Sequence, residues 1–205
     1  MKIKKVFLAL LIVVLINPVL GKYVFGSEES PMERIKSATK EITTILNDFC
    51  KDPEKKRAEA VKKIMIIADQ HFDWREMAKR TLARFWKQRT PEEKKEFTTL
   101  FRDLLKNTYI DKIASYSGEE VVFKGERTRD NYSVVETQVI SPKRGVKIPV
   151  NYRLMKKGNE WFVYDVVIEG VSLVNNYRAQ FNHIIQSSSY ETLVKKIKDK
   201  LAQKG

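Results

Sequence analysis

The sequence predicts an α+β domain in which helices cover one face of a bent, four-stranded antiparallel sheet. Two observations lead to this prediction. The chain has apolar residues at helical spacing up to Ser117-Gly118, and it changes to alternating apolar residues with turn signals between Val121 and Ile168. Two further helical patterns follow Gly170. Helices and strands are therefore segregated along the chain, which favours antiparallel pairing of successive strands.

Four helices are expected before the sheet. The first carries an apolar stripe that ends at Phe49, and Asp52-Pro53-Glu54 then starts a second helix with an N-cap and a proline at the first helical position. Asp73 with Glu76 forms a capping-box pattern for the third helix, and Thr90-Pro91-Glu92-Glu93 repeats the signal for a long fourth helix. The apolar stripe of the second helix consists of Val61, Ile64, Met65 and Ala68.

The strands are expected at 121–127 and 132–140, followed by a hairpin whose turn contains Lys157-Gly158-Asn159. We interpret this turn as a three-residue loop, because Gly and Asn both tolerate positive φ. One face of the hairpin would then be a continuous apolar ladder that pairs Leu154 with Phe162, Tyr152 with Tyr164, Val150 with Val166 and Ile148 with Ile168. The other face would pair Lys147 with Glu169, Asn151 with Asp165 and Met155 with Trp161. The alternative interpretation is that this is an ordinary half-buried hairpin whose apolar face packs on helices.

Residues 1–21 have the pattern of a secretory signal peptide. Three lysines precede an unbroken apolar run from Val6 to Ile16, and this run is too short to cross about 30 Å of hydrocarbon comfortably. Cleavage is expected after Gly21, or as late as residue 26, and an uncleaved anchor is the alternative. The chain is therefore expected to be exported, with residues 22–205 forming a single domain.

The protein is strongly basic. Its formal net charge of +13 falls to +10 when the three lysines of the leader are removed. Export argues against DNA or RNA as the partner of this charge. An anionic membrane surface, a lipid phosphate or an acidic protein face would suit it better, and a solvated surface that keeps the protein soluble is the alternative.

Cys50 is the single cysteine, so the fold has no internal disulfide and depends on its core. The position of Cys50 beside Phe49 on an apolar helical stripe favours burial of the thiol. Dimerisation through an exposed thiol is the alternative.

Signals for catalysis are weak. His71 and His183 are the only histidines, and neither has cysteine or acidic neighbours at metal-ligand spacing, so no zinc site is expected. The chain contains no nucleophile-elbow or phosphate-loop motif. Asp165 and Glu169 are the best candidates for a general base, because burial would raise the pKa of either carboxyl. The cross-strand partners described above favour a structural role for both. No enzymatic activity, metal or cofactor is expected.

Three stretches of the chain carry a family resemblance. They read FDWREMAKRTLARFWKQRTPEEKKEF at 72–97, FRDLLKNTYIDKIASYSGEEV at 101–121, and IPVNYRLMKKGNEWFVYDVVIEGVSLVNNYRAQF at 148–181. Together they resemble the exported phospholipid-binding proteins of the maintenance-of-lipid-asymmetry family, the MlaC-type or toluene-tolerance proteins. The likeness covers roughly residues 31–201, and segments 109–118 and 164–180 are its most specific parts. The departures are the short turn at Lys157-Gly158-Asn159 and the lysine-rich surface.

By this resemblance the chain would be a periplasmic carrier of glycerophospholipid. It would move this cargo between an outer-membrane lipoprotein complex and an inner-membrane ABC transporter with its lipid-transfer subunit, and it would need no cofactor. The resemblance also implies an apolar cavity between the bent sheet and its helices, in a domain of NTF2-like or cystatin-like general shape. Tyr109 and Val171 occupy positions that match the family's pocket.

The other candidate lipid-binding residues come from the expected pairing of the hairpin and from the helices that would oppose it. The expected sheet wall consists of Ile148, Val150, Tyr152, Leu154, Phe162, Tyr164, Val166, Ile168 and Val171. Tyr109, Ile113 and Val174 would face this wall from the helices.

Two functions of a different class remain open at this stage. One is an exported enzyme that uses Asp165 for acid-base chemistry in the bent-sheet cavity. The other is a lipid-free adaptor that binds an acidic partner through its basic surface, and this function predicts no cavity.

Overall fold

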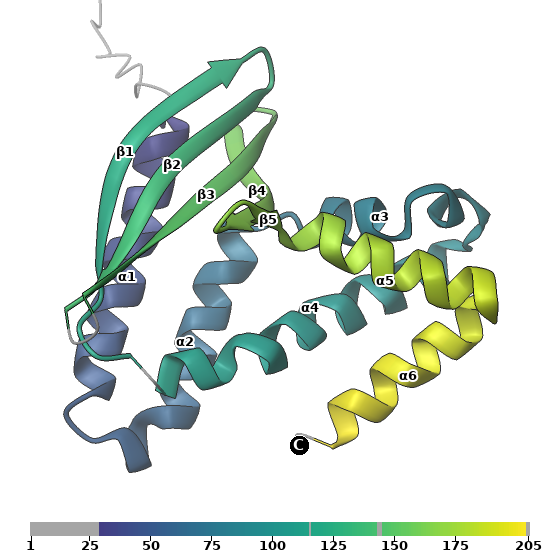
Figure 1. The fold of residues 1–205 in the computed structure, drawn as a ribbon, viewed down its shortest axis with the longest axis horizontal. Helices are drawn as coiled ribbons and strands as arrows, with labels where there is room; N and C mark the ends of the chain where they lie inside the picture. The colour runs from purple at the N-terminus through teal and green to yellow at the C-terminus, as the bar shows by residue number, and fades with distance from the viewer. Residues whose placement is uncertain (1–28, 115, 143–144, 204–205) are drawn as a thin grey trace, which may run out of the picture.

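The structure, a computed structural model, describes residues 29–114, 116–142 and 145–203. The expected signal peptide and its cleavage sites lie outside these residues. The elements run in the order of the expected α+β pattern (Figure 1). The helices are α1 (Pro31–Phe49), α2 (Pro53–His71), α3 (Trp74–Leu82), the 3₁₀ helix η1 (Ala83–Gln88), α4 (Pro91–Ala114), α5 (Leu173–Ser187) and α6 (Tyr190–Ala202). The strands are β1 (Glu120–Arg129), β2 (Tyr132–Ser141), β3 (Val146–Lys157), β4 (Glu160–Ile168) and β5 (Val171–Ser172).

The helix starts predicted from capping residues are confirmed. Asp52 accepts a hydrogen bond from the backbone N–H of Lys55, and Asp73 accepts one from Glu76. A reciprocal capping box starts α4, where the Thr90 hydroxyl accepts from the Glu93 backbone N–H at 3.2 Å and the Glu93 carboxylate accepts from the Thr90 N–H at 2.8 Å. These side chains satisfy backbone donors that have no partner within their own helix.

The sheet is antiparallel and has the order β1-β2-β3-β4-β5. It therefore contains five strands, and the prediction of four was wrong. The additional strand, β5, has only two residues, and it pairs Val171 with Ile168 across the turn Glu169-Gly170. Both turn residues have positive φ, 50° and 83°, as a tight two-residue hairpin turn requires. No strand was expected at β5, because helix α5 begins immediately after it.

The predicted register of the β3–β4 hairpin was also wrong. Lys157 pairs with Glu160, so the turn has two residues, Gly158 and Asn159. The register then shifts by one residue at a β-bulge, where Leu154 pairs with Val163 but Arg153 pairs with Asp165. The bulge leaves Tyr164 without a cross-strand partner and restores an apolar ladder beyond it, with Tyr152 opposite Val166 and Val150 opposite Ile168.

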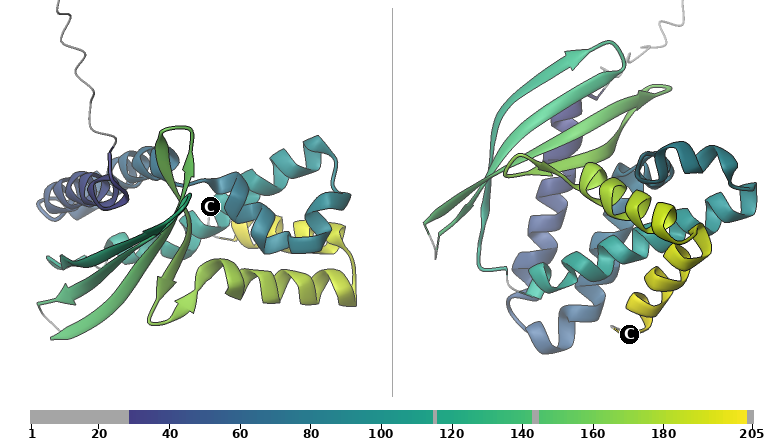
Figure 2. Two further views of the ribbon diagram at one scale, coloured as in Figure 1. Left: turned by 90° about the horizontal axis from the view of Figure 1, so that it is seen from above. Right: turned by 45° about the vertical axis from the view of Figure 1, so that its right-hand side comes forward.

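Two hydrophobic clusters stabilise the molecule, and the elements that form them lie in different parts of the fold (Figures 1 and 2). The helical cluster joins α3, η1, α4, α5 and α6, and its fully buried members include Met77, Phe97 and Phe101. The sheet cluster packs α1 against β2, β3 and β4 around Leu154 and Val163. Phe72 packs against both clusters. Among the described residues, the apolar stripe of α2, formed by Val61, Ile64, Met65 and Ala68, belongs to neither cluster. These side chains can therefore line a space between the clusters.

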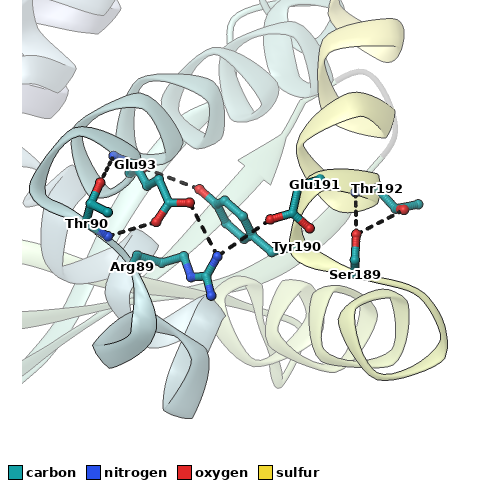
Figure 3. A network of polar contacts seen from close by, with 7 residues as sticks. All are labelled: Arg89, Thr90, Glu93, Ser189, Tyr190, Glu191 and Thr192. Atoms are coloured by element: carbon teal, nitrogen blue, oxygen red, sulfur yellow. Dashed lines mark hydrogen bonds and ion pairs between the residues drawn. The ribbon is translucent and has the colours of Figure 1, made fainter.

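A polar network joins the start of α4 to the start of α6 (Figure 3). The Arg89 guanidinium lies 3.4 Å from the Glu93 carboxylate and 3.9 Å from that of Glu191, and it stacks over the Tyr190 ring at 4.4 Å from the centroid. The Tyr190 hydroxyl donates to the backbone carbonyl of Glu93 at 3.4 Å. Because its ring is only 6% exposed, Tyr190 anchors α6 to the helical cluster.

Cys50 is exposed, so the expectation of burial was wrong. It follows the last residue of α1 and lies at the turn to α2, outside the apolar stripe. Its thiol lies 3.9 Å from the backbone carbonyl of Tyr116, within reach of a weak hydrogen bond.

Candidate functional site: an apolar hollow between sheet and helices

An apolar pocket of about 340 Å³ lies between the sheet and helices α2 and α4. We call it the inner pocket. Val150, Tyr152, Val166 and Ile168 contribute its sheet side. The α2 stripe contributes Val61, Ile64 and Met65, and the remaining lining residues are Phe72, Trp74, Met77, Leu105, Lys106, Tyr109 and Leu173.

A second pocket, of about 690 Å³, adjoins the first. We call it the outer pocket. It shares Tyr109, Ile168 and Leu173 with the inner pocket. The rest of its lining comes from the end of the sheet, the segment after α4 and the start of α5, and consists of Tyr116, Glu119, Val139, Ser141, Val146, Ile148, Glu169, Val171 and Asn176. A ligand that filled both pockets would therefore pass Tyr109.

The β-bulge positions the sheet side of the inner pocket. Before the bulge, the odd-numbered residues Trp161 and Val163 of β4 face the sheet cluster, and after it the even-numbered Val166 and Ile168 face the same side. Side chains alternate between faces along a strand, so only an extra residue can produce this change. The bulge thus turns Val166 and Ile168 to the side of the sheet that lines the inner pocket.

The two pockets differ in their charged groups. Among the described residues, Lys106 is the one charged residue that lines the inner pocket, whereas Glu119 and Glu169 line the outer pocket. Burial tends to raise the pKa of Glu119, but hydrogen bonds from the Ser117 N–H and hydroxyl and from the Ser141 hydroxyl outweigh it and lower the pKa. The Glu119 carboxylate is therefore held as an anion at the outer pocket.

Tyrosines at the hollow remain protonated. Burial is the largest cause of the raised pKa of Tyr109, and it is the cause for Tyr152 on the sheet side. Each ring thus presents a neutral, mostly apolar surface to the inner pocket, with a hydroxyl that can donate a hydrogen bond.

The structure brings most of the candidate lipid-binding residues together at the hollow. Those that line one or both pockets are Tyr109, Ile148, Val150, Tyr152, Val166, Ile168 and Val171. Ile113 lies in the last turn of α4, where side chains fall outside the described part of the structure.

Four candidates lie away from both pockets. Leu154 is fully buried in the sheet cluster, and Val174 is buried in the helical cluster. Phe162 alternates with the buried Trp161 and Val163, and Tyr164 is the bulge residue, so neither belongs to the apolar ladder that we expected.

On the helical side of the hollow, Tyr109 was expected, but the α2 stripe was not. The i, i+3, i+4 spacing of Val61, Ile64 and Met65 indicated a buried stripe, but spacing cannot identify the surface that a stripe faces. Leu173 was missed for another reason. It is the first residue of α5 and follows β5, the strand that the sequence analysis did not predict.

Asp165 has partners different from those expected. Its carboxylate accepts hydrogen bonds from the Arg153 guanidinium at 3.0 Å, the Ser172 hydroxyl at 2.6 Å and the backbone N–H of Val174 at 3.0 Å. The side chain is 3% exposed and lines neither the inner nor the outer pocket. The predicted pairing of Asn151 with Asp165 is wrong, and Asp165 instead attaches β4 to the start of α5.

The predicted pairing of Lys147 with Glu169 is also wrong, since the β3–β4 ladder ends with Val150 opposite Ile168 and the Glu169 N–H donates to the Pro149 carbonyl at 3.0 Å. Among the residues that the structure describes, no group of three or more His, Cys, Asp or Glu residues could hold a metal ion. Within the same residues, no helix combines the length and apolar character needed to span a membrane.

An α+β fold with an apolar pocket between its sheet and helices is typical of proteins that enclose an apolar ligand. The sequence profile of the family described as MlaC protein matches residues 36–199. This match covers most of the chain, and the chain belongs to the MlaC family.

Individual relatives agree with this assignment. The intermembrane phospholipid transport system binding protein MlaC of Haemophilus influenzae is 25% identical over 128 residues, which is 60% of each chain. The toluene tolerance protein ttg2D of Pseudomonas putida is 23% identical over 103 residues, 50% of this chain and 48% of the relative. The matched parts thus span about half to three fifths of these curated relatives.

A solved structure supports the fold over a longer range. The phospholipid-binding protein from Ralstonia solanacearum, determined in complex with a phospholipid, matches with a TM-score of 0.72 and 28% identity. The match covers 83% of this chain and 96% of that one.

Proposed function

We propose that this protein carries a glycerophospholipid, with the acyl chains in the inner pocket and the headgroup toward the outer pocket. The observation that supports this proposal most strongly is the adjoining pair of pockets, the inner one lined by apolar side chains from both sheet and helices. The family and the phospholipid bound to the Ralstonia relative agree with it. We include in the proposal an NTF2-like or cystatin-like cavity formed by the bend of the sheet.

The physical need for a carrier follows from the hydrophobic effect. A free phospholipid in water exposes its acyl chains at a cost of about 0.8 kcal/mol per methylene. Transfer of two chains through water therefore costs tens of kcal/mol, and an apolar pocket removes most of this cost. Binding of this kind requires no bond to break, so the protein would act without catalysis or a cofactor.

The lining residues would have distinct roles. Tyr109, at the junction of the pockets, would contact the lipid where acyl chains meet the glycerol backbone. Ile168 and Leu173 line both pockets and would contact both parts of the ligand. The candidates Ile113, Leu154, Phe162, Tyr164 and Val174 would contribute through packing, or not at all.

The cellular setting belongs to the same proposal. An N-terminal signal peptide at residues 1–21 would direct the protein to the periplasm. There it would shuttle lipid between an outer-membrane lipoprotein complex and an inner-membrane ABC transporter with its lipid-transfer subunit. The names of the Haemophilus and Pseudomonas relatives, which refer to intermembrane phospholipid transport and to toluene tolerance, are consistent with this role.

Native mass spectrometry of the purified protein, followed by lipid extraction, tests the proposal. The wild-type protein should carry phospholipid, and Ile168→Arg should lose it, because this change places a charge where the two pockets meet. Ile66→Arg is the matched control, since Ile66 is 50% exposed on α2 and lines neither pocket.

Circular dichroism would establish that both variants fold. A folded Ile168→Arg protein with full lipid occupancy would exclude the proposed site. Wild-type protein without lipid, and with no uptake from vesicles, would favour the lipid-free adaptor.

A further inference from the structure

A third pocket, of about 340 Å³, lies beside α3 and α5 and shares no lining residue with the inner or outer pocket. We call it the basic pocket. Its lining residues are Lys79, Arg80, Ala83, Arg153, Tyr164, Asp165, Val174, Asn175 and Arg178. Arg153 alternates along β3 with Tyr152 and Leu154, which face the sheet cluster, so the basic pocket lies at the opposite face of the sheet from the apolar hollow.

Positive charge exceeds negative charge in this pocket. Lys79, Arg80, Arg153 and Arg178 line it from α3, β3 and α5, and Asp165 is the one acidic lining residue. Asp165 is already engaged by three donors. Outside the lining, Glu76 accepts from Arg80 at 2.9 Å and from Lys79 at 3.0 Å. Two carboxylates therefore face four cations.

Two of these cations are partly withdrawn from solvent. The side chains of Arg80 and Arg153 are only 34% and 38% exposed. Each guanidinium carries five N–H donors, and a carboxylate engages one nitrogen of each. In the described part of the chain, the guanidinium of Arg178 has no ion pair at all. The exposed guanidinium of Arg178 and the spare donors of Arg80 and Arg153 can therefore bind an anionic ligand.

The Tyr164 ring holds the Arg80 guanidinium in a fixed orientation. The Arg80 guanidinium stacks on the Tyr164 ring at 4.2 Å from the centroid, which orients its planar fork. Tyr164 can occupy this position because it is the extra residue of the β4 bulge. Bulges commonly re-aim a side chain next to a functional site.

The backbone at the rim is strained as well. Ala83 has φ 50° and ψ −120°, a conformation that favours glycine. Such strain persists only where the surroundings enforce it, and it is concentrated at binding sites. The strained residue, the bulge and the surplus of cations thus occur at one pocket.

From these observations we infer that the basic pocket is a binding site for a phosphate group. Donors from three elements suit a tetrahedral ion with several oxygens, because each oxygen can accept from a different direction. A phosphate group could belong to free inorganic phosphate or to a lipid headgroup at a membrane surface. This inference does not depend on the proposed lipid pocket, with which the site shares no residue.

The test uses two probes on the purified protein at constant ionic strength. Inorganic phosphate is titrated while NMR follows the side-chain N–H signals of the arginines. Flotation then compares vesicles of phosphatidylcholine alone with vesicles that also contain phosphatidic acid. We expect either saturable shifts of the Arg80 and Arg178 side-chain signals with inorganic phosphate, or saturable binding to the vesicles that contain phosphatidic acid. Arg178→Gln and Arg80→Gln should weaken this binding by roughly tenfold or more.

Arg84→Gln is the matched control, because Arg84 lies in η1 over the Phe85 ring and outside the basic pocket. Arg178 is exposed, so its variant should fold even if the partly buried Arg80 variant does not. A response to inorganic phosphate supports the site with free phosphate as its source, and a response to phosphatidic acid alone supports it with a lipid headgroup. Absence of both responses, or an equal loss in Arg84→Gln, would overturn the inference.

Discussion

At the residue scale, the Tyr190 side chain attaches α6 to the helical cluster, and its hydroxyl makes this attachment dependent on pH. Burial raises the pKa of this tyrosine from the ordinary value of 10.0 to about 12, and the nearby Glu93 and Glu96 contribute further. The folded protein therefore retains the phenolic proton over a pH range in which the unfolded chain loses it. The stability that this side chain contributes is complete below pH 10 and is lost as the pH rises toward 12.

We predict that replacing Tyr190 by phenylalanine flattens the alkaline decline in stability. A shift of this size corresponds to about 2–3 kcal/mol between pH 10 and 12. Phenylalanine keeps the packing with Phe97 and has no proton to lose. Urea unfolding of both proteins at several pH values from 9 to 12 measures the difference. Parallel stability curves would show that the Tyr190 proton has no role.

At the scale of secondary-structure elements, the junction of β4, β5 and α5 depends on Asp165. The carboxylate holds Arg153 of β3 and the first turn of α5, and Ser172 both donates to Asp165 and caps α5. Leu173 at this junction lines the inner pocket and Val174 lines the basic pocket, so one buried carboxylate positions residues of both.

We predict that Asp165→Asn lowers the free energy of unfolding by about 2–4 kcal/mol. The change removes the charge that opposes Arg153 and weakens the bonds to Ser172 and Val174. Arg153 is partly exposed, which places the value below that of a fully buried ion pair. Denaturant unfolding measures it, with Asp130→Asn at an exposed turn as the matched control. Equal, small effects of the two substitutions would argue against a structural role of Asp165.

Elements with a local signal could be predicted from the sequence, and those that depend on distant contacts could not. Helix starts at Asp52, Asp73 and Thr90 are encoded by a cap and its partner within four residues, and the structure confirms them. The bulge at Tyr164 has no such signal. The extra residue allows the Asp165 carboxylate to accept a hydrogen bond from α5 while Val163 and Val166 both face inward. These contacts form only when the elements pack together.

The same distinction applies to the candidate site. Alternation along β3 identified Val150 and Tyr152 as inward-facing residues, because the extra residue of the bulge belongs to β4 and not to β3. Phe162 and Tyr164 were misassigned because a shift of one residue moves side chains to the opposite face. The contribution of α2 could not be predicted, because the stripe that opposes the sheet is determined by tertiary packing.

At the scale of the whole molecule, the sheet cluster and the helical cluster leave the hollow between them. Residues that line an empty space lack packing partners on one side. A bound lipid would supply those partners and connect α2 and α4 to the sheet. Because only the folded protein can bind in this way, the ligand should raise the apparent stability.

We predict that removing bound lipid lowers the melting temperature and that adding phospholipid restores it. At a free ligand concentration of 100 Kd, the gain is about 2.7 kcal/mol, or roughly 5–10 °C for a chain of this size. Differential scanning fluorimetry of delipidated and reloaded protein measures the shift. Ile168→Arg should show no gain on reloading, and an equal gain in this variant would place the lipid elsewhere.

The separation of the two clusters also has a consequence for how this sequence can diverge. Phe97, Phe101 and Leu154 have neighbours on every side, and exchanges there would cost several kcal/mol. Val61, Ile64 and Met65 border the hollow and can change size with less penalty to folding. Mutation can therefore reshape the hollow along α2 while the fold is preserved.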